Sequence, residues 1–207
     1  MFISFEGCEG TGKTTLSRFL FKKMSEKYSV LLTKEPGGCL FNIEIRKILM
    51  KYYKRIDFYT EALLYAADRT EHLRQVIIPA LKENKIVICD RYLDSSMAYQ
   101  GYARKLGIDF IKQINLLAMQ YLPKITLYLD LNPIVGLQRL KTKRQNKIEY
   151  FDLQPDNFHE EVRKGYLELC NQYPDRIYKI DATLPLDKIQ EIIEQKIDQI
   201  IEKKYEK

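Results

Sequence analysis

Residues 7–14 read Gly7-Cys8-Glu9-Gly10-Thr11-Gly12-Lys13-Thr14, which matches the pattern G-x-x-x-x-G-K-[ST]. The run Phe2–Glu6 before them is mostly apolar and predicts a short buried strand. After them, apolar residues recur at helical spacing, namely Leu16, Phe19, Leu20 and Met24. A strand, a glycine-rich loop and a helix in this order form the setting in which such a loop cradles phosphates. The stretch therefore predicts a P-loop that binds a nucleoside triphosphate.

Each residue type of a P-loop has a task. Glycine permits the backbone to curl so that successive N–H groups face a phosphate, and the helix that starts there adds the positive end of its dipole. Lys13 is expected to reach the β- and γ-phosphates, and the Thr14 hydroxyl to complete a Mg²⁺ shell. We predict that the triphosphate, which is ATP if the family resemblance described below holds, is bound by Gly7, Cys8, Glu9, Gly10, Thr11, Gly12, Lys13, Thr14 and Thr15.

Short apolar runs alternate with amphipathic helical patterns along the whole chain of 207 residues. Near-continuous apolar runs are typical of strands that are buried on both faces of a parallel sheet. We therefore expect a three-layer, doubly wound α/β fold of the P-loop NTPase type, with a parallel sheet of about five strands, in a single domain spanning 1–207. The predicted strands are Phe2–Glu6, Ser29–Thr33, Ile86–Asp90, Ile125–Leu129 and Arg176–Ile180.

Composition limits the classes of protein without choosing among them. The hydrophobic fraction of 45% indicates a globular core, and the N-terminal run is too short and interrupted for a signal peptide or a membrane span. Four dispersed cysteines without a CxxC pair favour a reducing compartment, so we expect a cytoplasmic protein. The net charge of +6 fits either nucleic acid or a small polyanion, and no nucleic-acid motif is present.

Charged residues at the predicted strand ends extend the candidate site. In an open α/β sheet, ligands bind beyond the carboxyl ends of the strands. Asp90, at the end of the third predicted strand, is expected to hold Mg²⁺, and Arg91 beside it to bind a phosphate; the plainer interpretation of the pair is a turn or a surface ion pair. The stretch Thr33–Gly38 predicts a turn whose second glycine allows the backbone to approach a ligand closely, and Arg46 lies in the helix that follows. The plainer interpretation of this stretch is an ordinary loop between a strand and a helix.

Two further segments suggest a base pocket and a lid. Tyr65 and Arg69 lie four residues apart and share a helix face, where a ring and a guanidinium are suited to a planar base; the plainer interpretation is a core tyrosine and a solvated arginine. The segment at about 139–152 is rich in lysine and arginine. Such a run is more often a solvated helix end, but here it is also suited to a lid that covers the transferring phosphoryl group.

The ordered set of motifs resembles the thymidylate kinase family along nearly the full chain. The segments that carry this resemblance are FEGCEGTGKTT, TKEPGG, LLYAADR, ICDRYLDSSMAYQG and GLQRLKTKRQNKIE. The resemblance implies a Mg²⁺-dependent enzyme of dTTP synthesis that moves the γ-phosphoryl group of ATP to dTMP. It also implies a homodimer that binds neither nucleic acid nor a membrane.

The family's site residues can be placed on matching positions. Glu9 resembles the acidic residue that reaches the sugar 3′-hydroxyl, Tyr99 the side chain that disfavours a ribose 2′-hydroxyl, and Arg139 the residue that lies against adenine, which the loop from Asp181 also borders. The resemblance assigns catalysis to Lys13, Arg91, Glu9 and a lid cation, Arg144 or Lys147. It assigns dTMP binding to Glu9, Glu35, Pro36, Arg46, Tyr65, Arg69, Arg91, Ser96, Tyr99 and Gln100, with Mg²⁺ at Thr14 and Asp90.

The chain departs from the family pattern at two positions. Cys39 stands where threonine is common, and Tyr65 stands where phenylalanine often stacks on the base. Glycine at Gly10 resembles the members that lack a P-loop arginine and take their catalytic cation from the lid.

The reaction explains the absence of an evident catalytic triad. A phosphate monoester has a second pKa near ~6, so the acceptor is largely a dianion and needs no general base. We therefore interpret His72 and His159 as surface residues in charged helical segments. The alternatives are a kinase for dCMP, UMP or GMP, and a nucleotide-controlled switch or binding module; the NKxD element typical of GTP switches is absent.

Overall fold

The computed structural model describes residues 1–52, 55–143 and 154–205. Its centre is a sheet of five strands in the order β2-β3-β1-β4-β5, and every neighbouring pair is parallel. This confirms the predicted fold class, and the strand ends agree with the prediction to within one residue. The strands are β1 (Phe2–Glu6), β2 (Val30–Lys34), β3 (Ile86–Asp90), β4 (Ile125–Asp130) and β5 (Ile177–Asp181).

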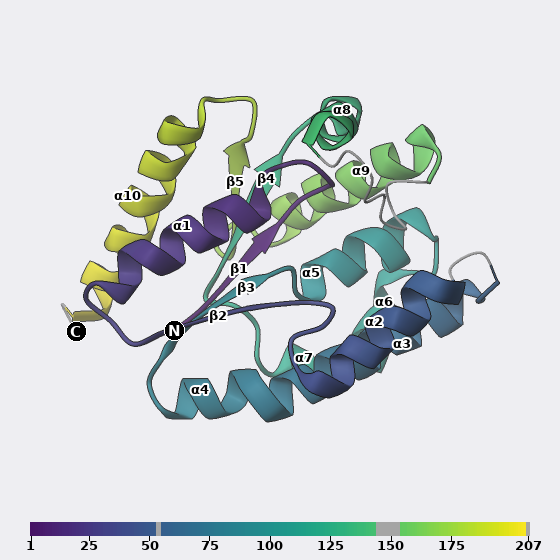
Figure 1. Cartoon of the computed structure of the whole chain (residues 1–207), viewed down its shortest axis with the longest axis horizontal. Helices are drawn as coiled ribbons and strands as arrows, with labels where there is room; N and C mark the ends of the chain where they lie inside the picture. Colours follow the sequence, from purple (N-terminus) through teal and green to yellow (C-terminus); the bar gives the residue numbers. More distant parts are fainter. Residues whose placement is uncertain (53–54, 144–153, 206–207) are drawn as a thin grey trace.

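Helices cover both faces of the sheet (Figure 1). On one face, α1 (Lys13–Ser25) and α10 (Leu186–Tyr205) pack their apolar stripes on β1 and β4. Among the described residues, no helix is both long and apolar enough to cross a bilayer. The remaining elements, most of which cover the other face, are α2 (Leu40–Tyr52), α3 (Phe58–His72), the π-helical segment η1 (Leu73–Ile77), α4 (Ile78–Lys82), α5 (Leu93–Ser96), the π-helical segment η2 (Met97–Ala103), α6 (Ile108–Ile114), α7 (Leu116–Met119), α8 (Pro133–Lys143) and α9 (Asp156–Gln172).

The two cores explain why the strands are apolar on both sides. Successive residues of β1 point to opposite faces, so Ile3 and Phe5 pack with α1 and α10, whereas Phe2 packs with the helices of the other face. Ser4, at the centre of the strand, is fully buried and shares a hydrogen bond of 2.8 Å with Thr126 Oγ1 of β4. The polar group is therefore satisfied inside the sheet.

The start of α8 bears on the predicted lid. Asn132 Oδ1 accepts a hydrogen bond of 3.0 Å from the Ile134 N–H, and Pro133 is the first helical residue. Of the predicted lid at about 139–152, residues 139–143 belong to α8. Residues 144–152 lie outside the described residues.

A pair of glycines joins α8 to the P-loop. A Cβ atom added to Gly136 would lie 2.2 Å from the Glu9 carbonyl oxygen, and one added to Gly10 would lie 2.1 Å from the Gly136 oxygen. Glycine within a helix costs about 1 kcal/mol relative to alanine, so the sequence accepts this cost to let the loop and helix touch. The backbone of Gly10 also has φ = +71°, which favours glycine.

We predict that Gly136→Ala lowers the melting temperature, because the added methyl group forces the P-loop away from α8. Overpacking of this kind costs about 1–3 kcal/mol, which exceeds the gain in helix propensity. Differential scanning calorimetry measures the change, and Val135→Ala on the same helix is the control. An unchanged or raised melting temperature would show that the contact imposes no constraint.

Candidate functional site

The P-loop lies where the carboxyl ends of the central strands meet. Gly7 to Gly12 connect β1 to α1, and Phe5 pairs with Asp90 of β3, so the loops after these two strands are neighbours. Gly12 caps α1 without a side-chain hydrogen bond, which leaves the first N–H groups of the helix for an anion.

A cavity of about 380 Å³ extends from the P-loop to α3. It brings together most of the residues that the sequence analysis assigned to ATP, Mg²⁺ and dTMP. Gly7, Cys8 and Thr11 do not line it; Cys8 and Thr11 are buried beneath the loop, where Thr11 Oγ1 donates to the Cys8 carbonyl at 3.0 Å. The predicted residues that line the cavity are Glu9, Gly10, Gly12, Lys13, Thr14, Thr15, Glu35, Pro36, Arg46, Tyr65, Arg69, Asp90, Arg91, Ser96, Tyr99, Gln100 and Arg139.

Lys13 lies across the mouth of the P-loop. Its Nζ donates to the carbonyl oxygens of Gly7 at 2.9 Å and Cys8 at 2.7 Å. Burial, and then the positive charge of Arg91, lower the pKa of Lys13 to about 8. A phosphate bound here would place a negative charge beside Lys13 and would stabilise the charged form of its ammonium group.

Thr14 and Asp90 meet at the edge of the cavity. Thr14 Oγ1 donates to Asp90 Oδ2 at 2.6 Å, and both residues line the cavity. Hydroxyl and carboxylate oxygens are the ligand types that Mg²⁺ prefers, so these residues fit the predicted ion. Two other strand-end carboxylates are engaged elsewhere, since Asp130 binds Arg163 at 2.8 Å and Asp181 Oδ1 caps the Thr183 N–H at 2.9 Å.

Arg91 is fixed by hydrogen bonds from several elements. Its backbone has φ = +72°, a conformation that is uncommon outside glycine, and its N–H donates to the Phe5 carbonyl at 2.9 Å. The guanidinium donates to the Gly7 carbonyl at 2.9 Å and to Glu9 Oε1 at 3.0 Å. The side chain also donates to Tyr99 and Tyr166, so it is held in the cavity before any ligand arrives.

Glu9 is an anion surrounded by donors. Burial would raise its pKa, but His159, Arg91, Lys13 and Tyr99 together lower the pKa to about 2. Tyr99 donates its hydroxyl to Glu9 Oε1 at 2.6 Å, and the ring edge of His159 places Nδ1 3.4 Å from Glu9 Oε2. The carboxylate is therefore ionised at neutral pH and held in the wall of the cavity by its donors.

Tyr65 and Arg69 both line the far end of the cavity, as their spacing predicted. Tyr65 is buried and packs on Ile45 and Leu49 of α2. Arg69 is only 2% exposed, so the alternative of a solvated arginine is wrong. Its Nε donates to Glu35 Oε2 at 2.8 Å, and Nη1 and Nη2 donate to Asn115 Oδ1 and the Tyr92 carbonyl.

Other predicted binding residues surround this end. Ser96 and Gln100 are buried on α5 and η2, and the Gln100 amide is oriented because its Nε2 donates to Glu61 Oε1 at 2.8 Å. Arg46 reaches from α2 into the cavity, with Nη1 3.5 Å from the Pro36 carbonyl oxygen. Arg46 thus adds a cation to the wall of the cavity beside the loop that follows β2.

At the other rim, Arg139 of α8 donates from Nη1 to the Ala182 carbonyl at 3.1 Å. The loop that begins at Asp181 therefore borders Arg139, and the contact of both with adenine stays a prediction. The two candidate catalytic cations of the lid, Arg144 and Lys147, lie outside the described residues.

The interpretation of both histidines as surface residues is wrong, since the side chains of His72 and His159 are fully buried. Charged neighbours along a helix do not show which face it presents, and here each ring meets an acidic side chain from a distant segment. His72 Nδ1 lies 2.9 Å from Glu35 Oε1, and His159 faces Glu9.

The role of Gly38 also differs from the expected one. A Cβ atom added there would lie 2.3 Å from two atoms of the His72 ring. The glycine therefore permits close approach to His72, and its place in the turn is explained without a ligand contact.

Sequence reasoning also missed several cavity residues. Arg18 lies four residues after Thr14 and shares its helix face, and Lys34 ends β2, so spacing and strand-end position could have indicated both. Glu6 and Tyr166 support Arg91 from below, with a hydrogen bond of 2.8 Å across 160 positions of sequence. Nothing local in the sequence indicates that pair.

Comparison with known proteins agrees with this geometry. The sequence model of the family "Thymidylate kinase" matches residues 5–193. The chain is 61% identical over 204 residues to the thymidylate kinase of Onion yellows phytoplasma, covering 98% of this chain and 99% of that protein. It is 46% identical over 206 residues to the thymidylate kinase of Anoxybacillus flavithermus, again over 98% and 99% of the two chains.

A solved structure shows the same architecture. The crystal structure of thymidylate kinase from Ehrlichia chaffeensis superposes with a TM-score of 0.78 at 33% identity, covering 96% of this chain and 98% of that one. The match of the family model over most of the chain, the high identities and the shared fold lead to one conclusion. This chain belongs to the thymidylate kinase family.

Proposed function

We propose that this chain transfers the γ-phosphoryl group of ATP to dTMP, which gives ADP and dTDP. The observation that carries the proposal is the single cavity lined by both the P-loop and Tyr65, whose wall also contains Arg91 and Arg46. A donor triphosphate in the loop and a planar base beside Tyr65 would bring two phosphates together next to these arginines.

The main barrier to this reaction is the electrostatic repulsion between the acceptor phosphate and the triphosphate of ATP. An oxygen of the acceptor phosphate forms a bond to the γ-phosphorus, while the bond from that phosphorus to the β–γ bridging oxygen breaks and ADP leaves. Each pair of unit charges at 4 Å costs roughly 4 kcal/mol at an effective dielectric of about 20. Lys13, Arg46 and Arg91 supply opposing charges, and the structure of the chain holds Arg91 in place beforehand.

Magnesium completes the proposed charge balance. The Thr14 hydroxyl and the Asp90 carboxylate would hold Mg²⁺, which when bound neutralises charge on the β- and γ-phosphates. The role of Glu9 follows from its ionised state, because a carboxylate can accept a hydrogen bond from the sugar 3′-hydroxyl. Tyr99 is tied to Glu9, so its ring lies beside the same part of the acceptor.

Selection of the base rests on the Tyr65 end of the cavity. Tyr65 offers a ring face for stacking, and Arg69 offers donors to a carbonyl oxygen of the base, since three contacts do not exhaust the five N–H groups of a guanidinium. A kinase for dCMP, UMP or GMP is the alternative within the same reaction class. The four free cysteines support a reducing, cytoplasmic location.

We also propose that the chain forms a homodimer through the outer faces of α2 and α3. These two helices lie side by side (Figure 1). They expose a set of large apolar side chains. An apolar surface of this kind on helices that carry Arg46, Tyr65 and Arg69 is suited to a second copy of itself. The exposed residues are Leu40, Phe41, Ile43, Ile48 and Tyr52 on α2, and Phe58, Tyr59 and Leu63 on α3.

A coupled assay of ADP release with a panel of monophosphates tests the proposed function. We expect dTMP to give a higher kcat/KM than dUMP, dCMP, UMP or dGMP, because the Tyr65 end selects the base. A thermal-shift series with the same nucleotides reports binding independently of turnover. A higher kcat/KM for another monophosphate would show that dTMP is not the preferred acceptor. Binding of ATP without formation of ADP would favour a nucleotide-controlled switch.

Replacement of Lys13 should abolish most of the turnover. We expect Lys13→Ala to lower kcat by about 10²–10³-fold, the usual effect of removing one donor that stabilises developing charge. Circular dichroism checks that the variant is folded, and Lys164→Ala, at an exposed position of α9 beside Glu161, is the matched control. Wild-type turnover by the Lys13 variant would refute the role given to this residue.

The dimer proposal predicts a change of mass. Phe41→Asp together with Leu63→Asp places charges on the exposed faces of α2 and α3, so light scattering after size exclusion should show a monomer where the wild type is a dimer. Leu186→Asp, at an exposed apolar position of α10, should leave the mass unchanged. A monomeric wild type, or a dimeric double variant, contradicts the proposed surface.

A further inference from the structure

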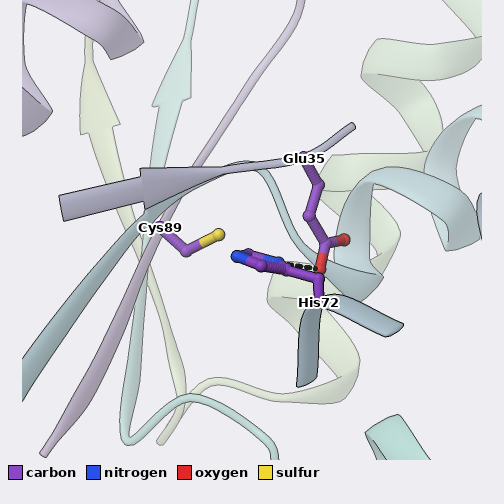
Figure 2. A group of neighbouring side chains, drawn as sticks. All are labelled: Glu35, His72 and Cys89. Carbon is purple, nitrogen blue, oxygen red and sulfur yellow. Dashed lines mark hydrogen bonds and ion pairs between the residues drawn. The ribbon is translucent and has the colours of Figure 1, made fainter. Parts of the chain in front are cut away.

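A buried chain of hydrogen bonds leads from the sheet to the base end of the cavity. The His72 ring lies between the Cys89 sulfur and the Glu35 carboxylate, and Figure 2 shows this arrangement. The His72 Nε2 atom is 2.7 Å from Thr33 Oγ1, and Nδ1 is 2.9 Å from Glu35 Oε1. The second oxygen of Glu35 accepts from Arg69 Nε at 2.8 Å.

The donor types of Glu35, His72 and Cys89 are also those of a zinc site, but their atoms are already engaged. Both oxygens of Glu35 are used by His72 and Arg69, and both nitrogens of His72 have partners. The Cys89 thiol donates to the Arg91 carbonyl at 3.0 Å, and burial raises its pKa well above the usual value, which disfavours the thiolate that zinc requires. The adjacent guanidinium of Arg69 would also repel a cation.

The chain of contacts fixes the position of the Glu35 side chain from two sides. A carboxylate can only accept hydrogen bonds, so the ring proton of His72 is assigned to Nδ1. Gly38 packs directly on the ring, since a Cβ atom at this position would lie 2.3 Å from it. The Gly37 N–H donates to Asp68 Oδ1 at 3.1 Å, one residue before Arg69 on α3. The turn that follows β2 is thus held against one face of α3.

We propose that His72 is a positioning residue for the acceptor nucleotide, because it holds Glu35, which in turn holds Arg69 at the base end of the cavity. His72 does not line the cavity, whereas Glu35 and Arg69 do, so His72 acts through them. This inference rests on the proposed function and adds a residue outside the cavity to the determinants of acceptor binding.

The positioning effect of His72 depends on the burial of the three groups that it connects. Arg69, Glu35 and His72 are at most 5% exposed, so water cannot replace a lost partner. Removal of the His72 donor leaves one oxygen of Glu35 unpaired, and the carboxylate is then free to turn toward Arg69 or into the cavity. Either movement shifts the guanidinium that faces the base. Among the residues that the structure describes, Glu35, Arg69 and His72 form no direct hydrogen bond with the P-loop, so binding of ATP should not change.

The test compares His72→Phe with His72→Asn in steady-state kinetics with ATP and dTMP. Phenylalanine keeps a flat ring but has no donor, whereas the asparagine amide can donate from near the position of Nδ1. We expect His72→Phe to raise the KM for dTMP about tenfold, which corresponds to about 1.4 kcal/mol, while the KM for ATP changes less than about twofold. His72→Asn should restore most of the affinity for dTMP.

A control and a double variant separate positioning from loss of stability. Ile193→Ala, in the core on the opposite face of the sheet, lowers stability without touching this chain of contacts, and should leave the KM for dTMP unchanged. In a Glu35→Gln background, His72→Phe should add little to the KM, because the two residues act in series. Binding of dTMP by calorimetry provides a readout that does not depend on turnover.

The possible outcomes are distinct. If the wild type phosphorylates dTMP but His72→Phe changes the two KM values together, or leaves that of dTMP unchanged, the inference is wrong and the proposed function stands. If the wild type has no activity on dTMP, the proposed function fails first. A rise in melting temperature with Zn²⁺ that is lost in Cys89→Ser would show a metal site in place of the positioning role.

Discussion

The parallel pairing of β1 with β3 is the constraint on which the site depends. It places the residues after both strands at one edge of the sheet, so that the cations Lys13 and Arg91 must lie close together. Burial, and then the positive charge of Arg91, lower the pKa of Lys13, and the negative charges of Asp90 and Glu9 offset this only in part. A site with an excess of positive charge is suited to phosphate groups. The hydrogen bond from the Arg91 guanidinium to the Gly7 carbonyl keeps this positive charge beside the P-loop.

The remainder of the structure keeps these charges in fixed positions. Gly136 lets α8 touch the P-loop, and Glu6 receives hydrogen bonds from the Tyr92 N–H and from Tyr166 beneath Arg91. Burial, followed by the charge of Asp94, raises the pKa of Glu6 to about 7, which shows how strongly this position is shielded from water. At the other end of the cavity, Glu35 accepts a hydrogen bond from Arg69 and thereby fixes the position of its guanidinium. Buried polar groups of this kind favour a single arrangement of the side chains, because water cannot replace a hydrogen-bond partner that is lost.

Features that depend on residues close together in the sequence could be predicted from the sequence. The P-loop, the strand-end residues Asp90 and Arg91, and the pair Tyr65 and Arg69 follow from spacing and from the alternation of strands and helices, and the cavity joins them. The histidines could not be interpreted in that way. Whether His72 is exposed depends on a turn 34–38 residues before it in the chain, and His159 meets a loop 150 residues away. Gly136 and the partners of Arg69 likewise depend on contacts between distant segments.

A crystal structure with dTMP and a non-hydrolysable ATP analogue tests the central claim most directly, because the claim concerns where two phosphates meet. The account predicts the triphosphate in the P-loop beside Lys13, the dTMP phosphate within hydrogen-bond distance of Arg91, and the thymine ring against Tyr65 with a carbonyl oxygen near Arg69. Density for the pyrimidine away from Tyr65 and Arg69, or an acceptor phosphate remote from Arg91, would contradict it.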